Sequence, residues 1–386
     1  MIKKSSLWLH KWLGLFTGLI VFIVSFTGCI YVFYDDLKII TYPERFIITE
    51  RIPTKKTAKP LSELVTLANQ TLPEGEEINR VDIYPSKDRT WVFRGMKLDK
   101  KKIWYSENTV YHKRIYIDPY LAKVQYVENS KFEFFQVVLQ IHRTLLLGSF
   151  GGTIVGVSTI IFLIMCFTGL ILWWPKKWKK KMVRKAVWVD FRVKWKRLVY
   201  DLHNVLGFQS LIFAIIIAFF GLTFSFPVLN EAISKLLNGK DAVEESSLDK
   251  HLKSTVKTSA NNVRSESLVK TLALHPEADM ISIRLRDSEK DHDVRVRLEK
   301  DKTSAFKWYY FDQKTGNLNK IRSSDNLRNG DYIASKNYDL HTGGIGGYPT
   351  KILAFFVSLI CASLPVTGTI VWWNKRPKKG RKIKKV

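Results

Sequence analysis

Residues 205–227 read VLGFQSLIFAIIIAFFGLTFSFP, a stretch without a single charged side chain. A helix needs about 20 apolar residues to cross the hydrocarbon layer of a bilayer, where every backbone amide must find a partner within the chain. Three further uncharged runs of similar length occupy residues 12–34, 151–174 and 352–373. We therefore predict a fold with four transmembrane helices.

The first run resembles a cleaved signal peptide in one respect, since Lys3 and Lys4 precede it. Its apolar stretch is longer than the h-region of such a peptide, and bulky residues such as Tyr31 and Phe33 stand where a cleavage site needs small ones. We expect this helix to be retained.

Lysine and arginine are concentrated at one end of each predicted helix. Residues 1–11, 175–204 and 374–386 together contain 22 of the 62 basic residues but only two of the 35 acidic ones. The positive-inside rule places such segments in the cytoplasm, so residues 35–150 and 228–350 are expected on the outer side. The formal net charge of +27 therefore indicates contact with anionic lipid headgroups rather than with nucleic acid.

These charges divide the chain into eight segments, with both termini in the cytoplasm. The segments are the amino terminus with the first helix (1–34), a first outer domain (35–150), the second helix (151–174), a basic cytoplasmic loop (175–204), the third helix (205–227), a second outer domain (228–350), the fourth helix (351–373) and a basic cytoplasmic tail (374–386).

The two halves of the chain share a pattern of histidine and glycine. His10 and His203 are each followed by Leu after three residues, by Gly after four and by a second Gly after eighteen. His142 and His341 are each followed by Thr-Gly after 26 and 27 residues and by Trp-Trp after 31 and 32. We interpret the chain as two parallel repeats of helix, outer domain and helix, related about an axis along the membrane normal.

Both outer domains have the pattern of an α+β fold. In each, a stretch with helical spacing is followed by three strand-like runs that end in a turn. The stretches are 60–69, 79–84, 90–94 and 112–118 in the first domain and 265–273, 280–286, 293–298 and 306–312 in the second.

These motifs resemble a known family. A helix followed by antiparallel strands that end in Asp118-Pro119 or in Asp312-Gln-Lys-Thr-Gly316 is similar to the PepSY module. The membrane motifs His-x-x-Leu-Gly and Thr-Gly-x-x-x-Trp-Trp resemble the PepSY-associated transmembrane family, which includes iron-regulated inner-membrane proteins and ferric-siderophore reductases. The resemblance implies a helical membrane bundle with two PepSY-like outer domains, a bacterial inner membrane, and a haem-dependent reductase.

Four of the eight histidines occupy equivalent positions in the two halves. His10 and His203 begin helices on the cytoplasmic side, whereas His142 and His341 precede helices on the outer side. A haem iron takes two axial ligands, and helix bundles commonly hold such cofactors between facing helices. We therefore predict two b-type haems, one bound by each pair. The sequence has no Cys-x-x-Cys-His motif for covalent haem attachment.

Neighbouring residues fit this hypothesis. Arg143 is a candidate partner for a haem propionate on the outer side, and Lys11 and Arg197 are candidates on the inner side. Small residues would let the macrocycle approach the backbone and aromatic residues would pack its faces. These are Gly14, Gly18, Gly151, Gly152, Gly156, Gly207, Trp12, Phe16, Phe150 and Phe208. The remaining histidines, which are His112, His251, His275 and His292, are expected at the surface.

The position of the outer histidines sets a geometric condition. His142 precedes Trp173 by 31 residues, which is about 46 Å in a continuous helix and exceeds the roughly 30 Å hydrocarbon layer. We expect either that His142 lies above the membrane or that the helix breaks at residues 148–152. The same holds for His341 and residues 343–347.

The arrangement predicts electron transfer across the membrane. The donor would be a quinone or a cytoplasmic reductase, and the resemblance indicates a ferric chelate as the acceptor in iron acquisition. In a first alternative, the outer domains are haem-free PepSY binding or inhibitory modules and the helices only anchor them. In a second, the protein is a transporter, which the lack of charged residues in the middle of the spans disfavours. Walker A, Rossmann and His-Glu-x-x-His motifs are absent from the sequence.

Overall fold

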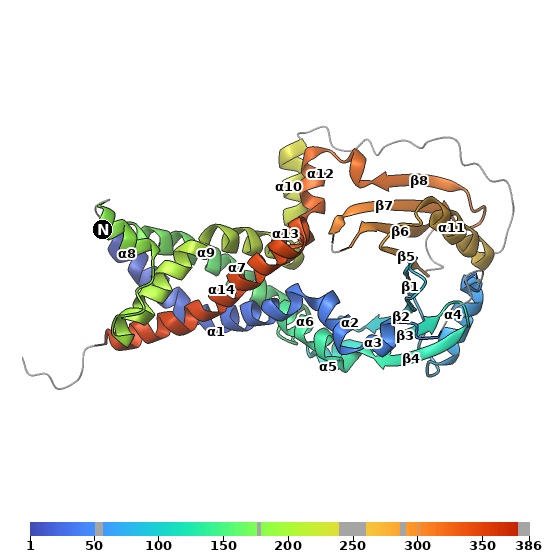
Figure 1. Cartoon of the computed structure of the whole chain (residues 1–386), viewed down its shortest axis with the longest axis horizontal. Coiled ribbons are helices and arrows are strands. Elements are labelled where there is room, and N and C mark those ends of the chain that lie inside the picture. The colour runs from blue at the N-terminus through green and yellow to red at the C-terminus, as the bar shows by residue number, and fades with distance from the viewer. Residues whose placement is uncertain (51–56, 176–178, 239–259, 286–290, 301, 377–386) are drawn as a thin grey trace, which may run out of the picture.

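The computed structural model describes residues 1–50, 57–175, 179–238, 260–285, 291–300 and 302–376. Part of the predicted basic loop and outer domains, most of the basic tail, and His251 lie outside the described residues. Among the described residues, four helices are long and apolar enough to cross a membrane: α1 (Ile2–Val32), α7 (Gly148–Trp173), α9 (Trp195–Ser225) and α14 (Tyr348–Asn374). The four predicted membrane helices are therefore confirmed. They form one bundle, which lies to the left in Figure 1.

Each helix of the bundle contacts a helix of the other half of the chain. α1 packs on α14 and α7, and α9 packs on α14 and α7. Large apolar side chains on the outside remain exposed, and Phe16 is 85% and Ile212 68% exposed. A large exposed apolar surface is favourable only in an apolar solvent, so this exposure fits a bundle surrounded by lipid.

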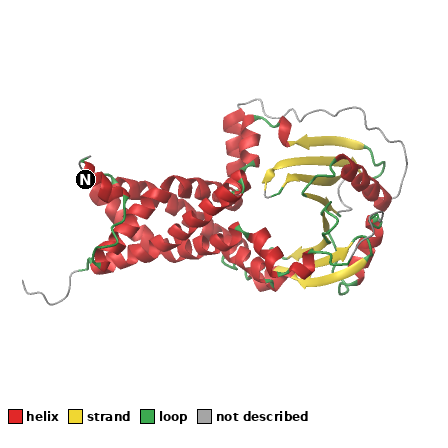
Figure 2. Ribbon diagram, viewed as in Figure 1, coloured by secondary structure: helices red, strands yellow, loops and turns green. Residues whose placement is uncertain are grey.

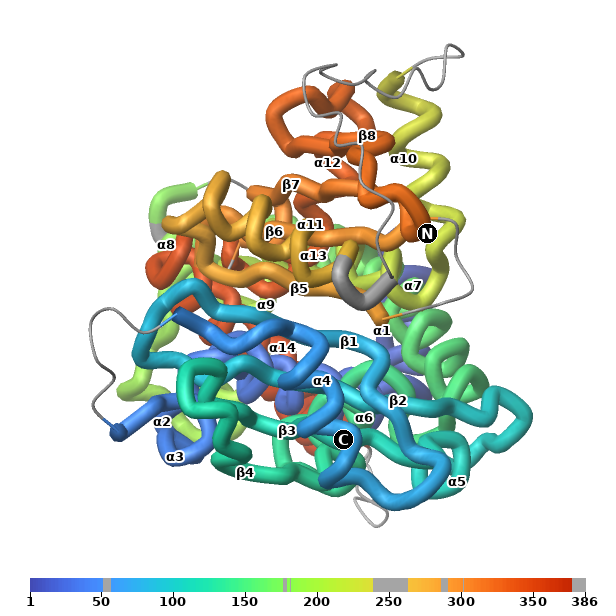
Figure 3. The backbone as a smooth tube through the Cα atoms, turned by 90° about the vertical axis from the view of Figure 1, so that its right-hand side faces the viewer, coloured from blue at the N-terminus to red at the C-terminus, as the bar shows by residue number. Residues whose placement is uncertain are grey.

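The eight strands in the described part of the chain form a single antiparallel sheet in the order β4-β3-β2-β1-β5-β6-β7-β8. The strands are β1 (Arg80–Ile83), β2 (Trp91–Leu98), β3 (Thr109–Asp118), β4 (Lys123–Asn129), β5 (Met280–Arg284), β6 (Asp291–Glu299), β7 (Lys302–Asp312) and β8 (Leu318–Ser323). Figure 3 shows them side by side, from β8 to β4. The sequence indicated two separate outer domains, but β1 pairs with β5, with Val81 opposite Ile283. If each half formed a four-stranded sheet of its own, β1 and β5 would each be an unpaired edge strand. Their pairing removes both edges.

The two faces of the sheet differ in chemistry. Alternate residues such as Val81, Phe93, Ile115 and Ile283 are fully buried on one face, where α4 (Leu61–Gln70) and α11 (Ala260–Leu274) cover them. These two helices lie at the end of the molecule opposite to the bundle (Figure 1). The other face carries arginines and carboxylates and is partly covered by α2 (Tyr34–Thr41) and α3 (Pro43–Phe46). Figure 2 shows this mixed region beside the all-helical bundle.

Short helices connect the sheet to the bundle. α6 (Phe134–Thr144) precedes α7, and α13 (Asn337–Thr342) precedes α14. The helical path is interrupted between α6 and α7 at Leu145 and Leu146, whose φ angles of 50° and 62° are in the left-handed region. Gly148 begins the next helix. Gly343 and Gly347, at φ 80° and 69°, make the corresponding break before α14. Both helices are therefore broken: in the second half the break lies at residues 343–347 as predicted, whereas in the first half it lies at residues 145–147 and not at the predicted 148–152, which are the first residues of α7.

The remaining helical segments complete the fold. They are α5 (Tyr105–Asn108), α8 (Lys180–Val187), α10 (Val228–Asn238), α12 (Asn329–Ser335) and the 3-10 turns η1 (Ser130–Phe132), η2 (Ser324–Asn326) and η3 (Gly344–Gly346).

Candidate functional site

The four equivalent histidines meet in two pairs, one toward each end of the bundle. His10 of α1 and His203 of α9 form the far-side pair, with ring centroids 6.3 Å apart and an interplanar angle of 85°. His142 of α6 and His341 of α13 form the sheet-side pair, with centroids 5.9 Å apart at 52°. Each pair thus joins one ring from each half of the chain, in the combination that the sequence pattern predicts.

Threonines hold the two far-side rings in one tautomer. Nδ1 of His10 lies 3.0 Å from Oγ1 of Thr168, and Nδ1 of His203 lies 3.0 Å from Oγ1 of Thr367. Each hydroxyl already donates to a carbonyl of its own helix, so it accepts the bond from the imidazole. The proton is therefore on Nδ1, and the Nε2 lone pair is available to a ligand.

Backbone carbonyls hold the two sheet-side rings in the same way. Nδ1 of His142 donates to the carbonyl of Val24 at 2.9 Å, and Nδ1 of His341 donates to that of Ile217 at 2.8 Å. Thr27 also lies 3.2 Å from Nδ1 of His142. All four rings therefore use Nδ1 for orientation, which is the arrangement that metal-binding histidines commonly show.

Glycine provides the space for each imidazole. A Cβ atom on Gly221 would lie 2.8 Å from Cε1 of His341, and one on Gly368 would lie 3.1 Å from Cε1 of His203. The corresponding distances are 3.3 Å from Gly28 to His142 and from Gly169 to His10. These four glycines are the ones that recur at offsets of 18 and 27 from the histidines. The repeated pattern therefore pairs each histidine with a glycine on another helix.

A comparison with known families identifies one that matches this chain. The family described as "PepSY-associated TM region" matches residues 7–375 of the 386.

The chain belongs to this PepSY-associated family.

The match covers both histidine pairs, all eight strands and nearly all of the four membrane helices, so the resemblance seen in the sequence motifs is confirmed. The comparison with curated proteins found no match. As a member of this family with four apolar helices, the chain is a multi-pass membrane protein in contact with the lipid bilayer.

The paired imidazoles of this PepSY-associated protein fit the demands of haem ligation. Two imidazoles bound at about 2 Å to opposite sides of one metal ion place their ring centroids roughly 6.5 Å apart. The two pairs have 6.3 and 5.9 Å. Ligation also requires neutral rings, and burial, together with His341, lowers the pKa of His142 to about 4. Burial likewise lowers the pKa of His341. One iron porphyrin per pair is thus compatible with the residues present.

Several neighbours predicted to hold a haem have other contacts. Arg143 follows His142 on α6 and its side chain is exposed. Arg197 is bound by Asp201 through two contacts of 2.8 Å, and Lys11 lies 4.6 Å from the ring centre of Trp12.

The small and aromatic residues predicted to contact a haem also have other roles. Cβ atoms on Gly14, Gly18 and Gly207 would face Met165, Pro365 and Leu364, which are residues of other membrane helices. These glycines therefore serve helix packing. Trp12, Phe16 and Phe150 are exposed on the outside of the bundle, and Phe208 stacks on Trp173. The sequence did not indicate Phe224, whose ring centroid lies 5.6 Å from that of His341.

The prediction that the other histidines lie at the surface is wrong for two of them. His112 and His292 are only 6% and 2% exposed, because they lie on central strands of the sheet. His292 stacks on Phe311 and bonds to the hydroxyl of Ser267 at 2.7 Å. His275 is half-buried and bonds to the hydroxyl of Tyr309. Among the described residues, no group of three or more metal-ligand side chains was found.

Two carboxylates connect the helices of the sheet-side histidines to the outer region, Glu133 to α2 and Asp339 to β7. Glu133 caps α6 by accepting from the backbone N–H groups of Phe135 and Gln136 at 3.1 and 3.0 Å, and it also pairs with buried Lys38. Asp339 of α13 is fully buried and accepts four hydrogen bonds from the backbone and hydroxyl groups of Thr303 and Ser304. The positions of His142 and His341 therefore depend on the fold of the sheet.

Proposed function

We propose that this PepSY-associated protein is a di-haem electron-transfer protein that reduces a ferric chelate, such as a ferric siderophore, in iron acquisition. The observation that carries the proposal is the approach of two pairs of imidazoles from the two halves of the chain. All four Nδ1 atoms are engaged in orientation, which leaves the four Nε2 lone pairs for a metal. Histidines that only anchored the helices in the interface would have no reason to meet in pairs twice.

The proposal includes the orientation in a bacterial inner membrane. The described parts of the basic segments lie at the end of the bundle away from the sheet, as the far-side pair does, so the positive-inside rule supports cytoplasmic termini and a periplasmic sheet. We regard the two halves as parallel repeats, each with a PepSY-like outer domain. The symmetric strand order, from β4 through the β1–β5 contact to β8, supports this division.

The chain itself would hold and orient the cofactors. Bound haem supplies one-electron redox chemistry. Nε2 of each histidine would hold the haem iron, and the acceptors at Nδ1 fix the ring and increase its basicity. His10 and Gly28, which lies beside His142, are separated by eighteen residues of α1, or about 27 Å along the helix. The two sites thus lie near opposite faces of a bilayer.

The reaction is a one-electron reduction of a ferric ion to a ferrous ion outside the cytoplasm. The electron comes from a quinol or a cytoplasmic reductase, because the sequence has no Rossmann motif for a nicotinamide or flavin cofactor. A ferrous ion is held less tightly by hard oxygen ligands, so reduction releases it from the chelator.

An absorption spectrum of the purified full-length protein tests the proposal. We expect Soret and α bands and two haems per chain after expression with adequate haem. His203→Ala should lose about half of the haem, whereas His275→Ala, outside both pairs, should lose none. Absence of the bands from the wild-type protein would refute the haem proposal and leave an anchored, haem-free PepSY module.

A further inference from the structure

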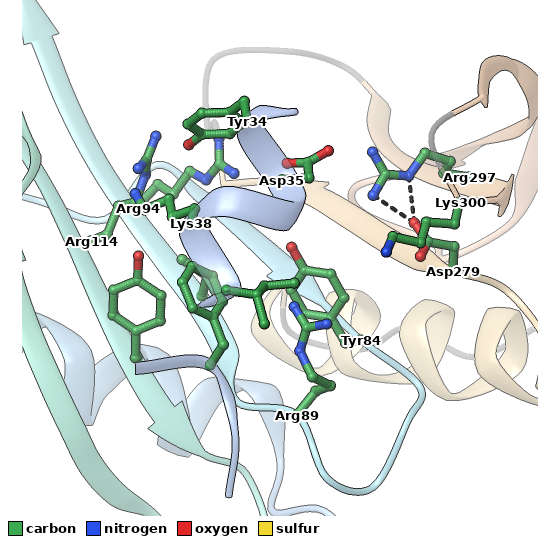
Figure 4. A pocket seen from close by; sticks show the side chains of 14 residues that line it. Tyr34, Asp35, Lys38, Tyr84, Arg89, Arg94, Arg114, Asp279, Arg297 and Lys300 are labelled. Atoms are coloured by element: carbon green, nitrogen blue, oxygen red, sulfur yellow. Dashed lines mark hydrogen bonds and ion pairs between the residues drawn. The ribbon is translucent and has the colours of Figure 1, made fainter. Parts of the chain in front are cut away.

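A cavity of about 570 Å³, including space open to solvent, lies between the polar face of the sheet and the start of α2. Both halves of the chain line it. Figure 4 shows Arg94, Arg114 and Lys38 on one side and Arg297 with Lys300 on the other. Arg89 and Tyr84 lie between these groups in the same view.

The lining is strongly basic. It contains six cationic side chains, which are Lys38, Arg89, Arg94, Arg114, Arg297 and Lys300, but only two carboxylates, Asp35 and Asp279. Glu128, which pairs with Lys38 and Arg114 at 3.3 Å, and Asp82, which pairs with Arg94 at 2.6 Å, do not line the cavity. Their side chains are 3% and 0% exposed. Five of the six cations are therefore paired with carboxylates: Lys38 and Arg114 with Glu128, Arg94 with Asp82, Arg297 with Asp279, and Lys300 with Asp36.

Arg89 differs from the other five cations. It makes no ion pair with any described residue, and its guanidinium stacks on Tyr84 and Phe46 at 4.4 and 5.6 Å from the ring centres. Stacking orients the guanidinium plane without using its hydrogen-bond donors. Arg89 is therefore an oriented cation without a counter-charge in the part of the chain that the structure describes.

Three buried donors at the cavity have no partner. The Nε atoms of Arg89, Arg94 and Arg114 are buried and make no hydrogen bond to any described residue. Arg114 itself is only 6% exposed. Buried donors are nearly always satisfied by protein, water or a ligand, and three guanidinium groups at one cavity match the oxygen atoms of a carboxylate or a similar oxyanion.

The cavity is close to the sheet-side histidines. Tyr34, which lines it, contacts Phe135 of α6 edge-on with ring centroids 5.8 Å apart, and α6 carries His142. Tyr34 follows Gly28, beside which His142 lies, by six positions, and α1 ends between them at Val32. A ligand in the cavity would therefore lie close to the helix that carries His142.

We propose that this cavity binds an anionic metal chelate through the oxygen atoms of its carboxylate groups, with Arg89 as the main free cation. The identity of this ligand as the reduced acceptor rests on the proposed function above. The anionic headgroup of a lipid in the outer leaflet has the same oxyanion chemistry, so the experiment must separate the two sources.

The test measures binding of gallium citrate, a redox-inert analogue of ferric citrate, to the full-length protein by equilibrium dialysis. We expect saturable binding that Arg89→Gln weakens about tenfold and that Arg89→Lys weakens less. Lys97→Gln is the matched control, because Lys97 is an exposed cation of β2 that does not line the cavity. It should change binding less than twofold. The uncharged chelate of gallium with acetohydroxamate should bind weakly to all variants.

Several outcomes would overturn the cavity proposal. The first is equal binding of gallium citrate to Arg89→Gln and to wild type. The second is binding of the uncharged chelate to wild type as strong as that of gallium citrate. The third is displacement of gallium citrate by an anionic lipid, where wild type retains the lipid and Arg89→Gln does not. The last result would identify a lipid headgroup as the occupant. Haem bands recorded on the same samples show that each variant is folded and keep the two proposals separate. Bands without gallium binding refute only the cavity, whereas gallium binding without bands refutes only the reduction.

Discussion

Gly221→Ala should displace His341 and weaken haem binding at the sheet-side pair. The added Cβ would lie 2.8 Å from Cε1 and 3.0 Å from Nδ1 of this ring, whereas ordinary contacts begin at 3.4 Å. The ring must therefore move by at least the difference of 0.6 Å. Its bond from Nδ1 to the carbonyl of Ile217, now 2.8 Å, would lengthen to about 3.4 Å, which is beyond a normal N–H···O bond.

The expected cost follows from these shifts. Overpacking costs about 1–3 kcal/mol and the lost hydrogen bond about 1 kcal/mol, while alanine restores up to about 1 kcal/mol of helix propensity. The net loss of roughly 1–3 kcal/mol corresponds to about 5- to 150-fold weaker binding at this pair. The other glycines should follow the order of their clearances, with Gly368→Ala next at 3.1 Å and Gly28→Ala milder at 3.3 Å.

Haem content and reduced-minus-oxidised spectra of the purified variants measure this effect. Gly207→Ala is the matched control, because it lies on the same helix and its Cβ would meet only Leu364, at 3.5 Å. It should retain both haems. The reasoning fails if Gly221→Ala binds two haems with an unchanged spectrum, or if Gly207→Ala loses as much haem as Gly221→Ala.

Three further changes test other parts of the structure. His203→Ala and His341→Ala should each remove a different half of the haem spectrum. The double variant His10→Ala/His203→Ala should lose no more haem than His203→Ala alone. Equal spectra for His203→Ala and His341→Ala would contradict the pairing. Burial raises the pKa of Glu128, but Lys38 and Arg114 lower it to about 2 from an ordinary 4.5. This group therefore contributes about 3 kcal/mol of stability above roughly pH 4.5, which is lost as the pH falls toward 2. In thermal unfolding, Glu128→Gln should be less stable than wild type at pH 7, and its stability should depend less on acid. An unchanged acid dependence would refute the role of this group. Asp339→Ala removes the acceptor of four hydrogen bonds between α13 and β7, so it should lower the melting temperature and alter only the sheet-side haem; a change in the far-side haem would contradict this local role.

The spacing of the histidines predicted their pairing, because each histidine lies on or next to a long helix. Within a helix, an offset of 18 residues has a definite length and direction, so equal offsets place the corresponding side chains at corresponding depths of their helices. The role of Gly28, Gly169, Gly221 and Gly368 was not predicted, although they are part of the same motif. It depends on which helices become neighbours, and offsets along one helix do not contain that information.

The outer region was less predictable. Alternating residues predicted β1, β2 and β3, but β4 was missed because its burial does not alternate clearly. The burial of His112 and His292 was missed because a polar residue in a short strand does not show which neighbours will cover it. The basic cavity was missed for a similar reason, since its six cations come from six separate places between Lys38 and Lys300.

Properties that depend only on residues close together in the sequence could be predicted from the sequence. The membrane admits only uncharged helical runs about 20 residues long, so four such runs and their flanking basic residues specify the bundle. The joining of the outer segments into one sheet by β1 and β5, and the cavity on its polar face, depend on contacts between residues about 200 positions apart. Hydrogen bonds and charges of that kind form only when distant segments pack together, because each strand could pair equally well with several partners until its edge is covered.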